Sequence, residues 1–384
     1  MANLLIYIAI ATQIYLIYLI LEFRIGFKKI KKLSHQEPLP INKLPSVTII
    51  LSALNEEKNL EASLISLLNL DYPNYNVIAI NDRSTDKTPD ILNRLKKEYS
   101  KLEVIHINHL PENWFGKSHA LHTASQQASG EWFLFTDADV TMHKDTLSKA
   151  ITYAVENKLD HLTLQERHPC NQYWFKTLML AHYVSYNMTM KPWRIRYLWS
   201  RKSMGRGAFN LVRTQAYQEC GGHKTIAMEC LDDLKLGALF KKNGYMQDIV
   251  DGQDFVEFKW YSSLKEMITG LEKNSFAYFN YKLFPILRDF IFALLFFIWP
   301  FIAATFFKGW VQGLNLINIG LTLYLFLFVA KQYGVLKRYA FSYPIGMSIL
   351  LFTVWNSVSA VYRHKGVVWR GTHYSIEKLK KSLL

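Results

Sequence analysis

A hydrophobic run over residues 132–136 ends abruptly in Asp137-Ala138-Asp139, where two carboxylates stand one residue apart. The run predicts a buried β-strand, and the acidic pair would mark its carboxyl end. In open α/β sheets, ligands bind just outside that edge. Two carboxylates placed there can hold a divalent cation that still needs oxygen ligands from elsewhere, usually from substrate phosphates. This stretch therefore points to a nucleoside diphosphate ligand.

The sequence around this run alternates between strand and helix patterns, which predicts an α/β fold with a mostly parallel sheet and helices on both faces. The predicted strands are 47–54, 76–80, 102–107, 132–136, 162–165 and 209–213. The predicted helices are 57–70, 89–98, 117–127 and 231–243.

Four stretches contain no charged side chain and are long enough, or nearly so, to cross a hydrocarbon core of about 30 Å as helices. They are residues 1–21, 290–307, 309–330 and 339–362. The first has neither a basic start nor an obvious cleavage site, so we expect an uncleaved anchor rather than a secretory signal. Basic residues at 24–32 follow it and favour a cytoplasmic position for the downstream domain.

These features predict five parts of the chain. They are an N-terminal anchor (1–23), a basic linker (24–45), a catalytic domain (46–284), C-terminal membrane segments (285–362, two or three spans) and a basic tail (363–384). Four full spans would place the basic tail outside the cell, against the charge rule. One of the last three segments could instead be re-entrant or interfacial, which would return the tail to the cytoplasm.

The formal net charge of +14 is compatible with nucleic acid or with anionic lipid as a partner. Because the basic residues cluster beside the apolar runs, we expect an anionic membrane surface and no nucleic acid. The three cysteines show neither metal-type spacing nor a disulfide framework. An integral cytoplasmic-membrane protein is the localisation that fits these patterns.

Polar side chains also follow the first two predicted strands. Asn55 and Glu56 end the first, and Asp82 ends the second, so a parallel sheet would bring all of them to the edge where Asp137 lies. Such acids can accept hydrogen bonds from a ribose or a base. Capping of a turn or helix is the alternative for Asp82, and it is the role we expect for Asp86, because Pro89 follows.

Three further residues are candidates for chemistry. Lys117 stands at a predicted helix start, where it could meet diphosphate oxygens or simply be a solvated surface lysine. Asp233, after Asp232 at another helix start, could deprotonate an acceptor hydroxyl or only interact with the helix dipole. Trp260 could be an apolar platform for a sugar or lipid, or an interfacial anchor. The aromatic-rich segment 173–199 could likewise be interfacial or an ordinary buried helix.

In this order, over residues 46–275, these segments resemble the inverting glycosyltransferases of family two, which have the GT-A fold. Ser52–Glu57 is similar to the first nucleotide-binding strand of that family and Asn81–Asp86 to the second. Asp137-Ala138-Asp139 resembles its metal signature, and Asp232-Asp233 resembles its Glu-Asp pair. The resemblance implies nucleotide-sugar binding by Ala53, Glu56, Asp82, Lys117, Asp137 and Trp260, Mg²⁺ or Mn²⁺ on Asp139 and Asp137, and base catalysis by Asp233.

One motif departs from the family pattern. Val256 and Lys259 stand where a Gln/Arg-x-x-Arg-Trp motif has its first residue and its arginine, which leaves only Trp260. Processive polysaccharide synthases normally keep that motif, so single-sugar transfer to a lipid fits better. Gly116-Lys117, Gly205-Arg206-Gly207 and the tail 368–374 are most similar to hopanoid-associated and carotenoid glycosyltransferases, relatives of ceramide glucosyltransferases.

The resemblance implies transfer of one sugar, with inversion, from a nucleoside-diphosphate donor that we expect to be UDP-linked. The acceptor would be the hydroxyl of a membrane lipid at the cytoplasmic face. Three alternatives stay open at this point: a processive synthase, a nucleotidyltransferase on a similar fold, and an inactive membrane-anchored protein that binds sugar nucleotides.

Overall fold

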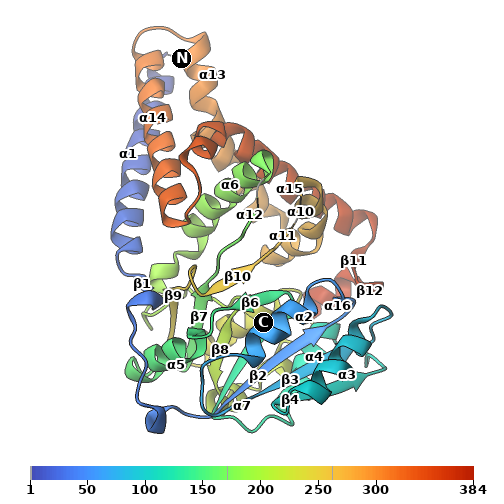
Figure 1. Cartoon of the computed structure of the whole chain (residues 1–384). Helices are drawn as coiled ribbons and strands as arrows, with labels where there is room; N and C mark the ends of the chain where they lie inside the picture. The colour runs from blue at the N-terminus through green and yellow to red at the C-terminus, as the bar shows by residue number, and fades with distance from the viewer. Residues whose placement is uncertain (1, 171, 262) are drawn as a thin grey trace. The chain divides into compact units, whose positions relative to one another are not determined.

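The computed structural model describes residues 2–170, 172–261 and 263–384 (Figure 1). The chain divides into two compact units, and each is described by itself. The helical unit comprises Met1–Lys29, Cys170–Lys191 and Tyr261–Lys380. The sheet unit comprises Ile30–Pro169, Pro192–Trp260 and Lys381–Leu384.

An eight-stranded sheet with the order β1-β9-β7-β8-β5-β2-β3-β4 forms the centre of the sheet unit. Only β8 runs antiparallel to its neighbours, so the predicted mostly parallel α/β architecture is confirmed. The strands are β1 (Lys31–Lys32), β2 (Val47–Ala53), β3 (Tyr75–Asp82), β4 (Leu102–Ile107), β5 (Trp132–Asp137), β7 (His161–Gln165), β8 (Asn210–Arg213) and β9 (Gln247–Asp251).

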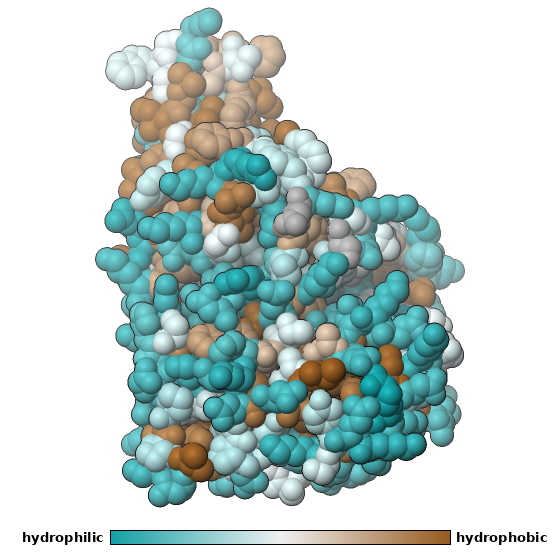
Figure 2. Space-filling model, in the orientation of Figure 1, coloured by the Kyte–Doolittle hydropathy of each residue, from teal (hydrophilic) through white to brown (hydrophobic). Residues whose placement is uncertain are grey.

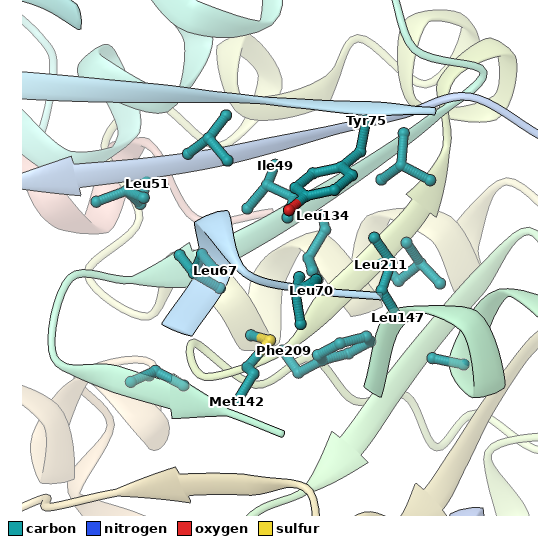
Figure 3. Close-up of a cluster of buried hydrophobic side chains, with 14 of the residues drawn as sticks. Ile49, Leu51, Leu67, Leu70, Tyr75, Leu134, Met142, Leu147, Phe209 and Leu211 are labelled. Carbon is teal, nitrogen blue, oxygen red and sulfur yellow. The ribbon is translucent and has the colours of Figure 1, made fainter. Parts of the chain in front are cut away.

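Helices cover both faces of this sheet, and two apolar cores result. One face packs against α2 (Leu60–Leu68), α3 (Thr88–Glu98) and α5 (Thr146–Glu156), and Figure 3 shows Leu67 and Leu147 from these helices beside Ile49 and Leu134 from the strands. The other packs against α4 (Gly116–Ser125), α7 (Thr214–Glu219) and α9 (Asp232–Lys242). Strands buried on both sides explain the continuous apolar runs in the sequence.

The predicted elements of the sheet unit are present, with ends that differ by at most three residues. The largest shift is at α2, which begins at Leu60 rather than at residue 57. The backbone N–H groups of Glu56 and Glu57 donate instead to Thr88 and Asp86, which holds this loop open at the edge of the sheet. Asp86 Oδ1 also accepts from the N–H group of Thr88, the first residue of α3, at 2.9 Å, although the N-cap position itself is Lys87.

Among the described residues of the helical unit, four helices are long and apolar enough to cross a membrane, at Asn3–Phe27, Leu283–Phe306, Trp310–Gln332 and Lys337–Arg363. They comprise α1 (Ala2–Phe27), α12 (Leu283–Ala293) with α13 (Trp299–Phe306), α14 (Trp310–Gln332) and α15 (Tyr343–Arg363). Hydrophobic side chains are exposed on α1 and α14 (Figure 2), as expected of surfaces that face lipid.

The aromatic-rich segment 173–199 does not form one helix. α6 (Tyr173–Met190) ends at Lys191, which takes a left-handed conformation with φ 47°. Half of the residues of α6 are buried, among them Phe175 and Leu178. Beyond it, Trp193 is buried and Trp199 is 73% exposed.

Candidate active site at the carboxyl edge of the sheet

The carboxyl ends of β2, β3 and β5 meet at the point where the strand order of the sheet reverses. From β2 the chain proceeds to β3 and β4 on one side and then returns to β5 on the other. In register, Ala53 lies opposite Asn81, and Ser52 lies opposite Asp137. The loops after these strands therefore share the place where doubly wound sheets bind ligands, as the sequence predicted.

Lys117 is held between two carboxylates in the first turn of α4. Its Nζ atom lies 2.7 Å from Asp137 Oδ1 and 3.2 Å from Asp232 Oδ2. Burial lowers the pKa of Lys117, but the charges of Asp137, Asp232 and Asp233 outweigh this and raise the pKa above its ordinary value. The side chain is 31% exposed, so it is a fixed positive charge at the rim of the site rather than a free surface lysine.

Asp233 stands at the start of α9 with its carboxylate fixed by two backbone groups. Oδ2 accepts from the Gly207 N–H group at 2.9 Å, and Oδ1 accepts from the Leu234 N–H group at 2.8 Å. Burial and the charge of Asp232 raise the pKa of Asp233 to about 6, although Lys117 acts in the opposite direction. A carboxylate with this pKa is ionised at neutral pH and more basic than usual, which is what a general base requires.

Two glycines allow the backbone to approach these carboxylates. A Cβ atom on Gly207 would lie 2.3 Å from Asp137 Oδ2, and one on Gly205 would lie 1.9 Å from the Asp233 carbonyl oxygen. Larger residues at either position would displace the acids. The sequence comparison with lipid glycosyltransferases singled out Gly205-Arg206-Gly207, and the structure gives the steric reason for both glycines.

Asp139 is surrounded by negative charge. Burial and the charges of Asp137 and Glu56 raise the pKa of Asp139 to about 7. Among residues 2–170, 172–261 and 263–384, no three His, Cys, Asp or Glu side chains form a group that could hold a metal ion. Asp137 and Asp139 would thus supply a partial set of hard oxygen ligands, which fits Mg²⁺ or Mn²⁺ completed by phosphate oxygens.

Asp82 is paired with its own neighbour in the chain. Arg83 Nε lies 2.7 Å from Asp82 Oδ1, and Arg83 Nη2 lies 3.0 Å from Asp82 Oδ2. Arg83 takes a left-handed φ of 61°, uncommon for a residue with a long side chain. Gly116 completes this arrangement, because a Cβ atom there would lie 2.6 Å from Asp82 Oδ2. Sequence reasoning placed Asp82 at the edge but did not anticipate this ion pair.

Trp260 stands two residues after a small antiparallel ribbon. β6 (Val140–Met142) directly follows Asp139, and β10 (Val256–Phe258) pairs with it so that Phe258 lies opposite Val140. The ring of Trp260 lies against His168, with ring centroids 5.6 Å apart. The sequence patterns predicted neither β6 nor β10, since three residues are too few for a periodic signal.

Sequence analysis did not predict a buried polar network next to Trp260, formed by Glu166, His168 and Arg206. His168 Nε2 lies 3.3 Å from Glu166 Oε1, and Arg206 Nη1 lies 2.6 Å from the same oxygen. Burial by itself would raise the pKa of Glu166. Arg206 and His168 have a larger effect in the opposite direction, and they lower the pKa of Glu166 to about 2. Glu166 and His168 follow β7 directly, so the signal that identified Asp82 and Asp137 was present here too.

The doubly wound sheet with an acidic carboxyl edge defines an α/β fold of the GT-A type. Residues 48–221 match the family model for glycosyl transferase family 2. This match agrees with the resemblance to family-two glycosyltransferases noted from the sequence.

Two curated relatives match the chain over about half its length. A β-monoglucosyldiacylglycerol synthase from Nostoc sp. is 33% identical over 204 residues, which cover 50% of this chain and 40% of the relative. A 4,4′-diaponeurosporenoate glycosyltransferase from Staphylococcus aureus is 28% identical over 223 residues, which cover 56% of each chain. The chain therefore spans only about half the length of these relatives.

Among solved structures, a mannosyltransferase from Pyrobaculum calidifontis in complex with GDP-Man and Mn²⁺ is similar at a TM-score of 0.55. The two sequences are 18% identical, and the match covers 94% of this chain and 98% of the other. At 18% sequence identity, this structural similarity shows that the two proteins share a fold.

Proposed function

We propose that this protein is a membrane-bound inverting glycosyltransferase that moves one sugar from a nucleoside-diphosphate donor to a lipid hydroxyl. The observation that carries the proposal is the position of Asp233. This half-buried carboxylate has a pKa of about 6 and is fixed by two backbone N–H groups, beside the Lys117–Asp137 ion pair. A base next to a positive charge that can bind diphosphate is what sugar transfer to a hydroxyl needs.

The diphosphate of the donor would lie over the edge of β2 and β5. Lys117 supplies positive charge there from the first turn of α4, and the N–H groups at a helix start can donate to an anion. Asp139 and Asp137 would hold Mg²⁺ or Mn²⁺. The bound cation would neutralise charge on the leaving diphosphate. The Mn²⁺ named with the Pyrobaculum mannosyltransferase supports a divalent cation in this fold.

The nucleoside would lie toward β3. We assign its recognition to Asp82, with Glu56 and the backbone of Ala53 in support. Asp82 is only 3% exposed and is oriented by Arg83, so a ribose or base would meet a carboxylate that is already fixed. A UDP-linked sugar is the donor we expect.

Asp233 would take the proton from the acceptor hydroxyl. The Gly207 N–H bond to Oδ2 and the Leu234 N–H bond to Oδ1 fix the plane of the carboxylate. The oxygen would then attack the anomeric carbon from the face opposite the diphosphate, so the product has inverted configuration. Trp260, whose ring lies tilted against that of His168, would present an apolar face to the sugar or to the acceptor.

The acceptor is a membrane lipid in this proposal. Four apolar helices provide the membrane attachment, and the two curated relatives are named for glucosyldiacylglycerol and diaponeurosporenoate. The basic residues at 24–32 favour a cytoplasmic sheet unit next to anionic lipid.

The direct test is transfer from a panel of radiolabelled nucleotide sugars into membrane lipid extract, with and without EDTA. Label in one discrete lipid that EDTA abolishes would support the proposal and identify the donor. Label in a growing polymer would replace it with a processive synthase. Donor binding by folded protein, without transfer to any lipid, would replace it with a sugar-nucleotide-binding protein.

A further inference from the structure

The last residues of the chain belong to the sheet unit, although the helical unit precedes them. Lys381–Leu384 group with Ile30–Pro169 and Pro192–Trp260. Within the sheet unit, the Leu384 N–H group donates to Glu229 Oε1 at 2.7 Å, and the Ser382 hydroxyl lies 3.5 Å from the Met228 carbonyl oxygen. The chain therefore ends on the unit that contains the candidate active site.

This return limits how often the chain can cross a membrane. The chain leaves the sheet unit after Trp260 and rejoins it at Lys381. A segment that leaves one side of a membrane and returns to that side must cross an even number of times. Three candidate spans lie between these residues, at 283–306, 310–332 and 337–363. At least one of them therefore does not cross.

The packing inside the helical unit identifies the exception. α13 and α14 pack against each other, and α1 packs against α14. α15 packs instead chiefly against α6 and α11 (Glu272–Tyr278), and in Figure 1 it runs obliquely away from α13 and α14. The chain leaves the sheet unit before α6 and rejoins it directly after α6, so α6 does not cross the membrane. α11 has seven residues, which is too short to cross. The main partners of α15 are thus helices that do not span.

Polar contacts in the middle of α15 support the same assignment. Asn356 Nδ2 donates to Glu272 Oε1 at 2.8 Å, and the Ser357 hydroxyl bonds to the Glu272 carbonyl oxygen. Asn356 lies about 20 Å along the helix from Tyr343 at the usual rise per residue. In a spanning helix Glu272 would be held deep in the hydrocarbon, where a carboxylate is strongly disfavoured. A helix that lies in the interface avoids this cost.

The outer face of α15 has the character of a lipid-facing surface. Ile345, Phe352, Trp355 and Tyr362 are each 48–59% exposed and recur at helical spacing. An apolar recess of about 430 Å³ opens beside this stripe, with Leu264, Ile268 and Ile298 in its lining. Basic side chains stand at both ends, at 337–338 and 363–365. An apolar stripe with Trp and Tyr between basic ends fits an anionic bilayer surface.

We propose that α15 lies in the plane of the membrane interface, with this stripe in the lipid leaflet. The chain then crosses the membrane three times, through α1, α12–α13 and α14, and its basic tail lies on the same side as the sheet unit. This assignment is independent of which sugar is transferred, because its tests do not use activity.

The first test is side-specific labelling of single cysteines with a membrane-impermeant maleimide, in intact spheroplasts and in inverted vesicles. The full chain with Cys170→Ser is the background, because Cys220 and Cys230 are buried. Lys43→Cys reports the sheet unit, Lys308→Cys the loop before α14, and Lys365→Cys the end of α15. We expect Lys365→Cys to label with Lys43→Cys, and Lys308→Cys to label from the opposite side. Any other pattern overturns the proposal.

The second test measures depth. Nitroxides at Ile345, Phe352 and Tyr362 should lie at depths within a few ångströms of one another. The matched control is Ile317 and Tyr324 on α14, which should differ by about 10 Å, as seven residues of a spanning helix require. A stepwise change of about 25 Å from Ile345 to Tyr362 would show that α15 spans and would overturn the proposal.

Discussion

Two strand ends at the same edge of the sheet carry acidic residues, and they differ in how far the negative charge of those residues is neutralised. After β3, the carboxylate of Asp82 meets both donors of Arg83 and is neutralised by its own neighbour in the chain. After β5, several carboxylates share a single lysine. We refer to this second group as the β5 cluster, and its members are Lys117, Asp137, Asp139, Asp232 and Asp233.

We infer from this difference that the strand end after β5 serves the chemical step. Excess negative charge and burial raise the pKa of Asp139 to about 7 and that of Asp233 to about 6. Such charge is costly unless a cation or a proton arrives. The Asp82–Arg83 pair after β3 has no such excess of negative charge, and it is suited to recognition. The predictions below test this contrast, starting with the largest expected effect.

Asp233→Asn should abolish transfer while leaving the fold and donor binding intact. Asparagine keeps the shape of the side chain but cannot accept a proton, and general bases of this kind contribute about 10²–10⁴-fold to the rate. We expect a loss of about 1,000-fold in kcat, measured by sugar transfer, with a donor Kd within about threefold of wild type by calorimetry.

Asp254→Asn is the matched control for this change, because Asp254 is an exposed carboxylate of the sheet unit that pairs with Arg167. It should transfer sugar at the wild-type rate. If Asp233→Asn turned over near the wild-type rate, Asp233 would not be the base, and the β5 cluster would have only a charge-binding role.

Asp139→Asn should weaken activation by Mn²⁺ by about 100-fold, because one of two hard oxygen ligands is lost. The metal-free variant should also be more stable than wild type by a few degrees in Tm, since a crowded carboxylate is removed. Metal titration of transfer and thermal melting in EDTA measure the two effects. Asp145→Asn, an acid beyond β6 that pairs with His143, should change neither. Unchanged Mn²⁺ activation in Asp139→Asn would remove Asp139 from the metal site.

Much of this site could be predicted from the sequence because the relevant signals are local. Apolar runs that end in Asp82 or Asp137 predicted strand ends, and parallel pairing then brought those ends together without any knowledge of distant contacts. The stretch around Lys117 likewise predicted a helix start. Family resemblance added the role of Asp233, for which the pattern alone allowed a simple interaction with the helix dipole.

The parts that sequence reasoning missed depend on tertiary contacts. The Asp82–Arg83 pair requires a left-handed residue at Arg83 and a glycine at 116, and neither has a periodic signature. The buried Glu166–Arg206 pair joins residues forty positions apart in the sequence. The hydropathy pattern shows four similar apolar runs. It does not indicate that the chain returns to the sheet unit at Lys381.

The rate of transfer should fall at acidic pH with an inflection near 6. A general base works only when unprotonated, so a pKa of about 6 for Asp233 predicts full activity above that pH and a tenfold loss per pH unit below it. The measurement is kcat against pH at saturating donor and Mn²⁺. Asp232→Asn removes a charge that raises this pKa, so it should move the inflection to lower pH. An inflection that does not respond to Asp232→Asn would belong to another group.

Arg83→Ala should have the smallest effect, and it tests the other side of the comparison. The variant removes both hydrogen bonds to the Asp82 carboxylate, so that carboxylate loses its fixed orientation. A partly exposed ion pair contributes up to about 1 kcal/mol, so we expect the KM for donor to rise by about threefold with kcat unchanged. Arg83→Lys keeps the charge and should recover part of the affinity. A loss of activity in Arg83→Ala as large as that expected for Asp139→Asn would mean that both strand ends serve the chemical step. Recognition could then no longer be assigned to the end of β3 and chemistry to the end of β5.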